Sequence, residues 1–391
     1  MTKSAKVRLL AGIGLSLALL TILVHLGRLE LTVQNSPNLH THQDINPWIQ
    51  EVSPSLLGKQ LSSILSSDWK TSPGGFNIQS PIFPTYTSSS RLRHQLEQQF
   101  PYDPLKPMPK HIWQTYKHGL ESPEFPKHER KRVDSWVKNN PEYKHSLLSD
   151  EEMHRFVETE FATIPLVVEA FKVLPKPVLQ ADFFRYLVVF ARGGIYTDVD
   201  TVNLKPIGTW ISSQPLVYGE NNNPGLVVGV ESSIEKRTWR KNFTRLLQLA
   251  QWTLQGKPGH PALLDLISHI TEHTIMRYRN NELHRIFGRT ATEDVMNWTG
   301  PGAWTDSVLK YLDELFQNDQ YIANRSWEEF TPYFNQRSLD KFSNAVVVHD
   351  VVILPLTSFC PENNGGGSTK DPMAYVEHCY DGSWKNGKLF G

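Results

Sequence analysis

The sequence predicts an α/β fold, a sandwich in which helices cover a mainly parallel β-sheet, preceded by an N-terminal membrane anchor and a stem. Two observations predict this class. From Pro107 onward, short apolar or alternating runs typical of strands are interleaved with stretches whose apolar residues recur every three or four positions, as in helices. Ahead of them lie one long apolar run and a polar segment without a sustained period.

The N-terminus carries a membrane signal. Residues 1–8 contain Lys3, Lys6 and Arg8, and residues 9–26 form an almost wholly apolar run that approaches the ~20 residues needed to cross a bilayer. The basic flank predicts a cytosolic tail at 1–8, a signal-anchor helix at 9–26 and a lumenal remainder, which is a single-pass type II topology. A cleaved signal peptide is the alternative, although no small-x-small cleavage site follows closely.

Residues 27–106 are interpreted as a stem, because Ser, Pro, Gln and Asn dominate and such a segment buries too little apolar surface to order itself well. Only Arg91 to Phe100 is compatible with a short helix there. The lumenal globular domain is expected to span residues 107–391. The chain has 40 basic and 40 acidic side chains and no basic stripe, so nothing in its charge indicates a nucleic-acid partner.

The globular part opens with alternating strands and helices. Residues 109–115 are expected to form a strand, 130–139 a helix that Asn140-Pro141 ends, and 143–148 a second strand. Residues 149–152 have a capping-type sequence that opens the next helix. This alternation predicts a ligand site at the C-terminal ends of the strands.

The stretch from 178 to 200 carries the strongest signal. A helix is predicted by apolar residues at roughly four-residue spacing, namely Leu179, Phe183, Leu187 and Phe190. Asp182 and Arg185 are neighbours on its surface, and Gly193-Gly194 supplies a left-handed end. The following IYTDVDTV alternates like a strand, on which Asp198 and Asp200 point the same way.

The D-x-D pair of Asp198 and Asp200 indicates a metal site at the end of this strand. The repulsion between two neighbouring carboxylates has to be offset by a cation, and hard divalent ions such as Mg²⁺ or Mn²⁺ favour oxygen ligands. A charged strand end without a ligand is the alternative for an isolated pair. The preceding Asp182-x-x-Arg185 and the glycine pair favour the metal site.

After the pair, strands are expected at 215–220, 225–230, 345–348 and 351–354. A helical insertion is predicted between roughly 234 and 330, where Thr299-Gly300-Pro301-Gly302 makes a tight turn. Its three helices are indicated by three apolar stripes: Leu246, Leu247, Ala250 and Leu254; Leu263, Leu264, Ile267 and Ile270; Val308, Leu312, Leu315 and Phe316.

Two features are compatible with a lumenal address. An oxidising compartment permits a bridge between Cys360 and Cys379, with two free thiols as the alternative. Sequons for N-glycosylation begin at Asn242, Asn297 and Asn324, although such triplets also arise by chance.

Four segments together resemble a known family: the stretch at 180–200, the opening PKHIWQTYK, the TGPG turn and the closing H-x-x-x-G-S-W-K. Over about residues 107–387 the chain resembles fungal D-x-D glycosyltransferases of glycosyltransferase family 32, and among them the initiation-specific α-1,6-mannosyltransferases. The resemblance implies a GT-A-like, Rossmann-type catalytic domain, GDP-mannose as donor, Mn²⁺ as metal, a Golgi location and retention of the anomeric configuration.

The resemblance also assigns the metal ligands. Asp198 and Asp200 would bind Mn²⁺ at the donor diphosphate, and His378 would complete the ligand set. The family pattern often has a second histidine where this chain has Cys379. A histidine in a loop, without a metal, is the alternative for His378.

By the same resemblance, Asp182 and Arg185 would contact the donor sugar and nucleoside, and Trp384 and Lys385 the diphosphate. Asp182 and Asp200 are the expected catalytic residues, since a carboxylate favours an oxocarbenium-like sugar and a metal favours the departing nucleotide. The alternatives are an intrahelical ion pair for Asp182 and Arg185 and a packing element at the C-terminus.

The implied function is that of a Golgi type II membrane protein that transfers mannose from GDP-mannose to the N-glycan core of glycoproteins in α-1,6 linkage, alone or in a mannosyltransferase complex. A mannosyltransferase acting on inositol-phosphoceramide is one alternative, for which further hydrophobic segments near the C-terminus would be expected. A non-catalytic subunit of a mannan polymerase complex is another, and such a subunit would not need the D-x-D pair.

Overall fold

The computed structural model describes residues 76–78, 91–214, 223–233, 243–317, 342–362 and 366–381. The predicted anchor at 9–26, most of the stem, the strand at 215–220 and the closing Trp384 and Lys385 lie outside these residues. None of the helices in the described part is long and apolar enough to cross a membrane.

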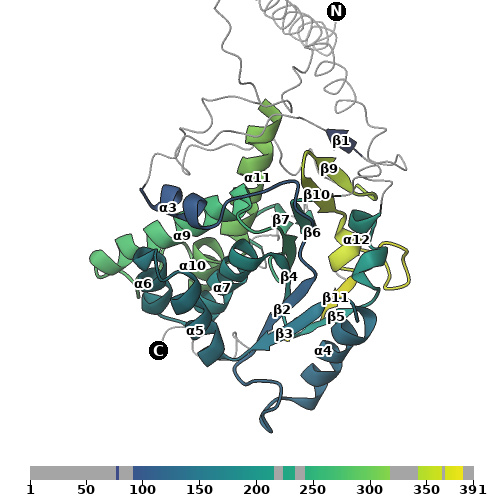
Figure 1. Ribbon diagram of the computed structural model, residues 1–391, viewed down its shortest axis with the longest axis horizontal. Helices are drawn as coiled ribbons and strands as arrows, with labels where there is room; N and C mark the ends of the chain where they lie inside the picture. The colour runs from purple at the N-terminus through teal and green to yellow at the C-terminus, as the bar shows by residue number, and fades with distance from the viewer. Residues whose placement is uncertain are drawn as a thin grey trace, which may run out of the picture. The chain divides into compact units, whose positions relative to one another are not determined.

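A mixed β-sheet forms the centre of the fold (Figure 1). Its strands lie in the order β1-β9-β10-β6-β8-β4-β2-β3, and β7 pairs with β6. Their bounds are β1 Phe76–Ile78, β2 His111–Thr115, β3 Lys144–Leu148, β4 Gly194–Thr197, β6 Leu226–Ser233, β7 Leu247–Leu249, β8 Thr253–Gly256, β9 Val346–Val348 and β10 Val351–Leu354.

The sheet combines parallel and antiparallel pairs. Strand β2 is parallel to both β3 and β4, β10 is parallel to β6, and β1 is parallel to β9. Strand β8 lies between β4 and β6 and is antiparallel to both, while β9 with β10 and β6 with β7 are also antiparallel. The α/β class is confirmed, and the parallel strands include β4, which leads into the D-x-D pair.

Helices and short elements cover the sheet through two apolar cores. The larger core takes side chains from α3 Arg91–Gln99, α5 Asp150–Glu160, α6 Pro165–Val173, α7 Pro177–Arg192, α9 Pro261–Arg279, α10 Ala291–Trp298 and α11 Pro301–Gln317. The smaller core takes them from α4 Lys127–Asn139, the 3-10 turns η2 Ile207–Thr209 and η3 Ile211–Ser213, α12 Leu356–Phe359 and strand β11 Val376–His378. Strand β11 pairs with β5 Thr201–Asn203 in a separate two-stranded sheet beside α4 (Figure 1).

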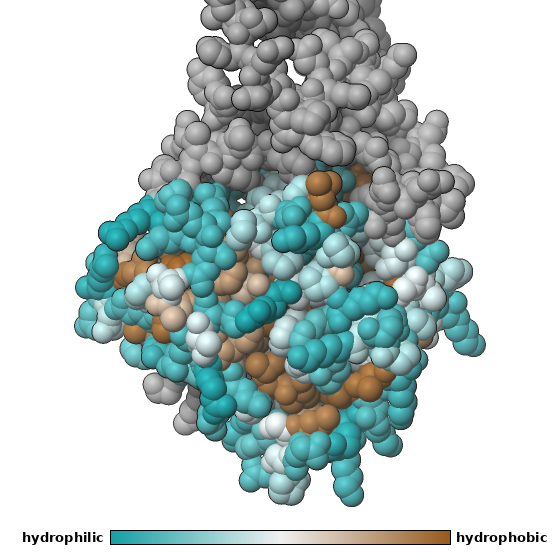
Figure 2. All heavy atoms as spheres, in the orientation of Figure 1, coloured by the Kyte–Doolittle hydropathy of each residue, from teal (hydrophilic) through white to brown (hydrophobic). Residues whose placement is uncertain are grey.

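The described surface is mostly hydrophilic in the view of Figure 2, where apolar side chains gather in limited areas. Large exposed apolar residues include Leu105, Met276 and Tyr278. Single exposed apolar residues of this kind are normal on a protein surface.

Helix α7 confirms the central prediction. Its apolar stripe is buried, and the helix ends at Arg192 with Gly193 as its cap, at a φ of +66°. Gly194 has a φ of +102°, and a Cβ on this residue would collide with the carbonyl oxygen of His111. A Cβ on Gly193 would lie 2.6 Å from Cδ of Pro258. The glycine pair therefore lets the chain turn from α7 into β4 directly against β2.

Most other expected elements are present, with shifted ends. The strands at 111–115 and 144–148 are confirmed, and α4 begins three residues before the predicted helix. Ser149 and Glu152 make the expected capping box at the start of α5.

The helix predicted from Leu246, Leu247, Ala250 and Leu254 is wrong, because this stretch forms β7, a turn and β8. Strands β7 and β8 have only three and four residues, all of them buried, so the alternation of apolar and polar residues within each is too short to indicate a strand. The polar residues of these strands, such as Gln248 and Gln255, are themselves buried. A short, fully buried stretch of this kind does not distinguish a strand from a helix.

The predicted bridge between Cys360 and Cys379 is also wrong, since both cysteines are free. Cys360 is buried after α12, and its Sγ lies 3.4 Å from Oη of Tyr380. Cys379 follows β11, and its backbone N–H donates to the carbonyl oxygen of Asp200 at 2.9 Å. The pairing of β11 with β5 thus directs Cys379 toward the D-x-D turn.

Candidate active site

The D-x-D pair lies in the turn between β4 and β5, at the C-terminal end of β4. The sequence predicts a strand that continues through Asp200, but β4 ends at Thr197. The hydroxyl of Thr201 donates to the carbonyl of Asp198 at 2.6 Å, and the N–H of Asp198 donates to the carbonyl of Trp252 at 2.8 Å. These bonds close the turn and fix the backbone of the pair at the end of the strand.

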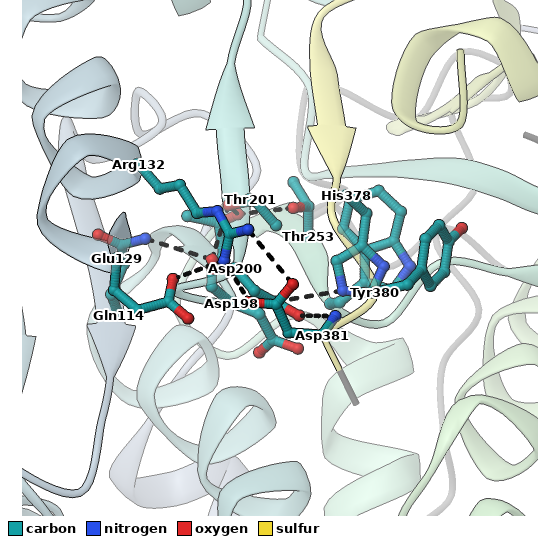
Figure 3. A network of polar contacts seen from close by, with 12 residues as sticks. Gln114, Glu129, Arg132, Asp198, Asp200, Thr201, Thr253, His378, Tyr380 and Asp381 are labelled. Atoms are coloured by element: carbon teal, nitrogen blue, oxygen red, sulfur yellow. Dashed lines mark hydrogen bonds and ion pairs between the residues drawn. The ribbon is translucent and has the colours of Figure 1, made fainter. Parts of the chain in front are cut away.

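His378 meets this turn from the other end of the chain. Strand β11 is antiparallel to β5 and places His378 opposite Thr201. Its Nε2 lies 3.2 Å from Oδ1 of Asp200. One ligand atom from each of Asp198, Asp200 and His378 falls within 4.8 Å of the others (Figure 3). Two carboxylates and an imidazole form a donor set that suits Mn²⁺ and similar divalent ions, so these residues fit the metal that the family implies.

Two aromatic rings hold His378. The Trp252 ring stacks on it at 4.5 Å and 16°, and the Tyr380 ring lies 4.0 Å away at 59°. The indole N–H of Trp252 donates to Oε1 of Glu231 at 3.1 Å, which fixes the indole in turn. Sequence reasoning missed Trp252, because it lies within a stretch assigned to a helix.

Asp182 and Arg185 face the same turn from α7. Arg185 lies with its Nη1 2.6 Å from Oδ1 of Asp182 and its Nη2 3.2 Å from Oδ1 of Asp198. Both α7 side chains are buried, at 4% exposure. The intrahelical ion pair is therefore present, and the same guanidinium also reaches the D-x-D pair.

Asp182 has two further donors. Nε2 of Gln251 donates to its Oδ1, and the hydroxyl of Thr299 donates to its Oδ2, each at 3.2 Å. Thr299 belongs to the TGPG turn, which was interpreted only as a backbone turn. The side chain of Thr299 thus contacts Asp182, a predicted catalytic residue. The TGPG motif draws attention to Thr299, but the sequence does not show this contact.

The carboxyl groups titrate differently because their partners differ. Burial raises the pKa of Asp182 to about 6, although Arg185 opposes the shift. Burial also raises the pKa of Asp198, with Arg185 opposing and Asp200 adding to the rise. For Asp200 burial acts in the same direction, but the hydrogen bond and charge of His378 hold its pKa below the ordinary value. The two members of the pair are therefore electrostatically distinct.

The structure brings together five of the seven predicted site residues: Asp182, Arg185, Asp198, Asp200 and His378. Trp384 and Lys385 lie outside the described residues, and their contacts with a diphosphate stay predictions.

Comparison with known proteins gives consistent results. Residues 126–217 match the family model of the glycosyltransferase sugar-binding region containing a DXD motif. The initiation-specific α-1,6-mannosyltransferase of Candida albicans is 40% identical over 85% of this chain and 86% of its own length, and that of Saccharomyces cerevisiae is 33% identical over 75% and 82%. A mannosyl phosphorylinositol ceramide synthase of S. cerevisiae is 32% identical over only 26% of this chain and 25% of its own.

Proposed function

The chain belongs to the family of the initiation-specific α-1,6-mannosyltransferases, and from this premise we propose that it transfers mannose from GDP-mannose to an N-glycan core in α-1,6 linkage, with retention of configuration. The family resemblance seen in the four sequence motifs is confirmed, and the protein is a glycosyltransferase. The observation that supports the proposed chemistry most directly is the meeting of Asp198, Asp200 and His378 beside the Asp182–Arg185 pair.

The chain's own residues prepare this site before any substrate arrives. Arg185 is a buried cation between Asp182 and Asp198, so it orients both carboxylates and limits their repulsion. Asp182, held by Gln251 and Thr299, offers negative charge to a sugar that develops positive charge. A bound divalent ion, which we propose to be Mn²⁺, would supply positive charge to the diphosphate as the glycosidic bond breaks.

The expected location is part of the same proposal. We propose a type II protein of the Golgi membrane, anchored by residues 9–26 and spaced from the bilayer by the stem at 27–106, with a GT-A-like domain in the lumen. Its acceptor would be a glycan on glycoproteins, and a complex with other mannosyltransferases is compatible with this address.

Both alternatives have less support. The similarity to the ceramide-modifying relative covers a quarter of each chain, whereas similarity to the initiation-specific enzymes covers most of both. A non-catalytic subunit would not require the convergence of His378 from the C-terminal segment on the D-x-D turn. The N-glycan mannosyltransferase therefore accounts for more of the observations.

A donor panel tests the proposal. The full-length protein in detergent is offered GDP-mannose, UDP-galactose and UDP-GlcNAc with Mn²⁺, and with either a high-mannose glycan or inositol-phosphoceramide. We expect transfer from GDP-mannose to the glycan, with an α-1,6 linkage in the mass spectrum and loss of activity in EDTA. Transfer from a UDP-sugar, or to the lipid alone, would overturn it.

A matched pair of variants tests the site. Asp200→Asn should abolish transfer with an unchanged circular dichroism spectrum, because it removes a carboxylate from the ligand set. Asp134→Asn, which changes an exposed carboxylate that pairs with Lys138 on α4, should retain full activity. Full activity in Asp200→Asn would contradict the assignment.

A further inference from the structure

The C-terminal segment Val376–Asp381 crosses the D-x-D turn. Strand β11 fixes its first half against β5. Beyond the strand, the N–H of Cys379 donates to the carbonyl of Asp200 at 2.9 Å. The N–H of Asp381 donates to Oδ2 of Asp200 at 3.3 Å. The carboxylate of Asp200 thus contacts His378 with one oxygen and the Asp381 backbone with the other. The position of this segment sets the geometry of the ligand group.

Tyr380 turns the chain back toward Asp200 in a conformation that needs support. Its φ is +51°, a left-handed value that costs a residue with a Cβ about 1–2 kcal/mol. Such a conformation persists only where surrounding contacts determine it. The Tyr380 ring lies against His378 on one side of the turn, and the carboxylate of Asp381 is held on the other.

Arg132 on α4 holds that carboxylate. Its Nη1 donates to Oδ2 of Asp381 at 2.6 Å and its Nη2 to Oδ1 at 3.3 Å, a two-pronged contact that fixes orientation as well as distance (Figure 3). Nη1 also donates to Oε2 of Glu129 at 3.0 Å. The side chain of Glu129 is 7% exposed and that of Arg132 is 17% exposed, so the guanidinium is largely buried, whereas the side chain of Asp381 is 34% exposed.

The start of α4 explains why Glu129 is available. Glu129 occupies the third helical position, where the glutamate of a capping box folds back onto the N–H of the capping residue. The capping residue here is Pro126, which has no N–H. Glu129 therefore turns to Arg132 and holds the guanidinium toward Asp381.

We propose that Arg132 is a positioning residue of the transferase: by holding Asp381 it fixes the segment that sets His378 and Asp200 as metal ligands. Arg132 acts through Asp381. Its Nη1 and Nη2 already donate hydrogen bonds to Glu129 and Asp381. The inference rests on the proposed function for the role of the ion, but its structural part concerns the metal-free protein alone.

Two measurements on the full-length protein test it. The first is hydrogen exchange of peptides covering 376–381 without metal. The second is the Kd of Mn²⁺ with GDP present, from the electron paramagnetic resonance signal of free Mn²⁺. The variants are Arg132→Met, Asp381→Ala and the double variant. Arg155→Met, which removes an exposed ion pair with Glu151 on α5, is the matched control.

Arg132→Met and Asp381→Ala should each speed exchange in 376–381 and raise the Kd of Mn²⁺ about tenfold, the low end for groups that support metal ligands. The double variant should be no worse than either single variant, because both changes break one contact. Arg155→Met should match the wild type.

Other results would overturn the inference. Unchanged exchange and Kd would show that the segment holds its place without Arg132. A double variant whose Kd rises about a hundredfold, the product of the single effects, would mean that Arg132 acts on the ligands directly. If Arg132→Met does not fold, Asp381→Ala decides the outcome, because it breaks the same contact. A wild type that does not bind Mn²⁺ would instead contradict the proposed function, while the exchange data would still judge the role of Arg132.

Discussion

Replacing Asp182 with asparagine should stabilise the protein and impair transfer. The carboxyl is 4% exposed, and burial raises its pKa from the ordinary 3.8 to about 6. Asparagine has the same shape and no charge to desolvate. It can still accept from Gln251 and Arg185, which now contact Oδ1 of the aspartate. The fold therefore loses a destabilising charge and keeps most of its hydrogen bonds.

The magnitude follows from the shift in pKa. A rise from 3.8 to about 6 means that the fold disfavours the ionised carboxyl by about 3 kcal/mol at neutral pH, which is an upper limit for the gain in Asp182→Asn. At about 2 °C per kcal/mol for a chain of this size, the melting temperature should rise by no more than about 6 °C.

The pH dependence gives the sign of the effect. Because the folded-state pKa of Asp182 is raised, the contribution of this one group to stability is most favourable below pH 3.8 and is lost as pH rises through about 6. The advantage of Asp182→Asn should thus be full at pH 8 and fall to about half near pH 5.

Thermal unfolding in EDTA at pH 8 and pH 5 is the assay, with Asp134→Asn as the exposed control. A lower melting temperature for Asp182→Asn at pH 8, or a difference that does not change with pH, would refute the assigned cost of this buried charge. Transfer should fall at least about a hundredfold, because the neutral side chain no longer favours a cationic sugar.

Three further contacts can be tested singly. Gly194→Ala should lower stability by at least about 2 kcal/mol, because its Cβ would collide with strand β2; an unchanged denaturation midpoint would show that the strands can separate. Trp252→Leu should lower kcat/KM about tenfold with native circular dichroism, since His378 loses its stacking partner; wild-type kcat/KM would exclude that role. Dithiothreitol should not change the melting temperature, because Cys360 and Cys379 are free; a bridged peptide in non-reducing mass spectrometry would contradict this.

The parts of the fold that could be predicted depend on local rules. The apolar stripe of α7, its glycine end and the capping box of α5 are each set by a few consecutive residues. Three physical causes produce them: burial of one helix face, a positive φ and pairing of a backbone N–H. Each of these causes leaves a recognisable pattern in the sequence. Helix α9 and helix α11 follow the same logic.

The errors arise where tertiary contacts decide. Strands β7 and β8 are buried on both faces and have only three and four residues, so their pattern is too short to distinguish a strand from a helix. The two cysteines lie near each other along the chain, but β11 directs Cys379 toward Asp200 while Cys360 stays buried after α12. Proximity in sequence therefore did not determine proximity of the sulfur atoms.

The site was predicted through motifs, but its supporting residues were not. Trp252, Thr299 and Arg132 come from a sheet turn, a helix boundary and a surface helix, and no spacing relates them to the D-x-D pair. Each acts on a site residue that was predicted: His378, Asp182 or, through Asp381, Asp200. Such contacts depend on how elements far apart in the sequence pack together. The periodicity of a single sequence does not reveal this packing.

The electrostatic balance of the site shows why this support matters. Two carboxylates at one turn repel each other, yet each has its own partner: Arg185 for Asp198, and His378 with the Asp381 N–H for Asp200. Both partners of Asp200 belong to the segment 376–381. Its strand, β11, pairs with β5, although the two strands are far apart in the sequence. Any change that loosens this segment removes together the predicted metal ligand His378 and the Asp381 N–H that donates to the Asp200 carboxylate. The cation site and the docking of the C-terminal segment are consequently one structural unit, and they should be lost together.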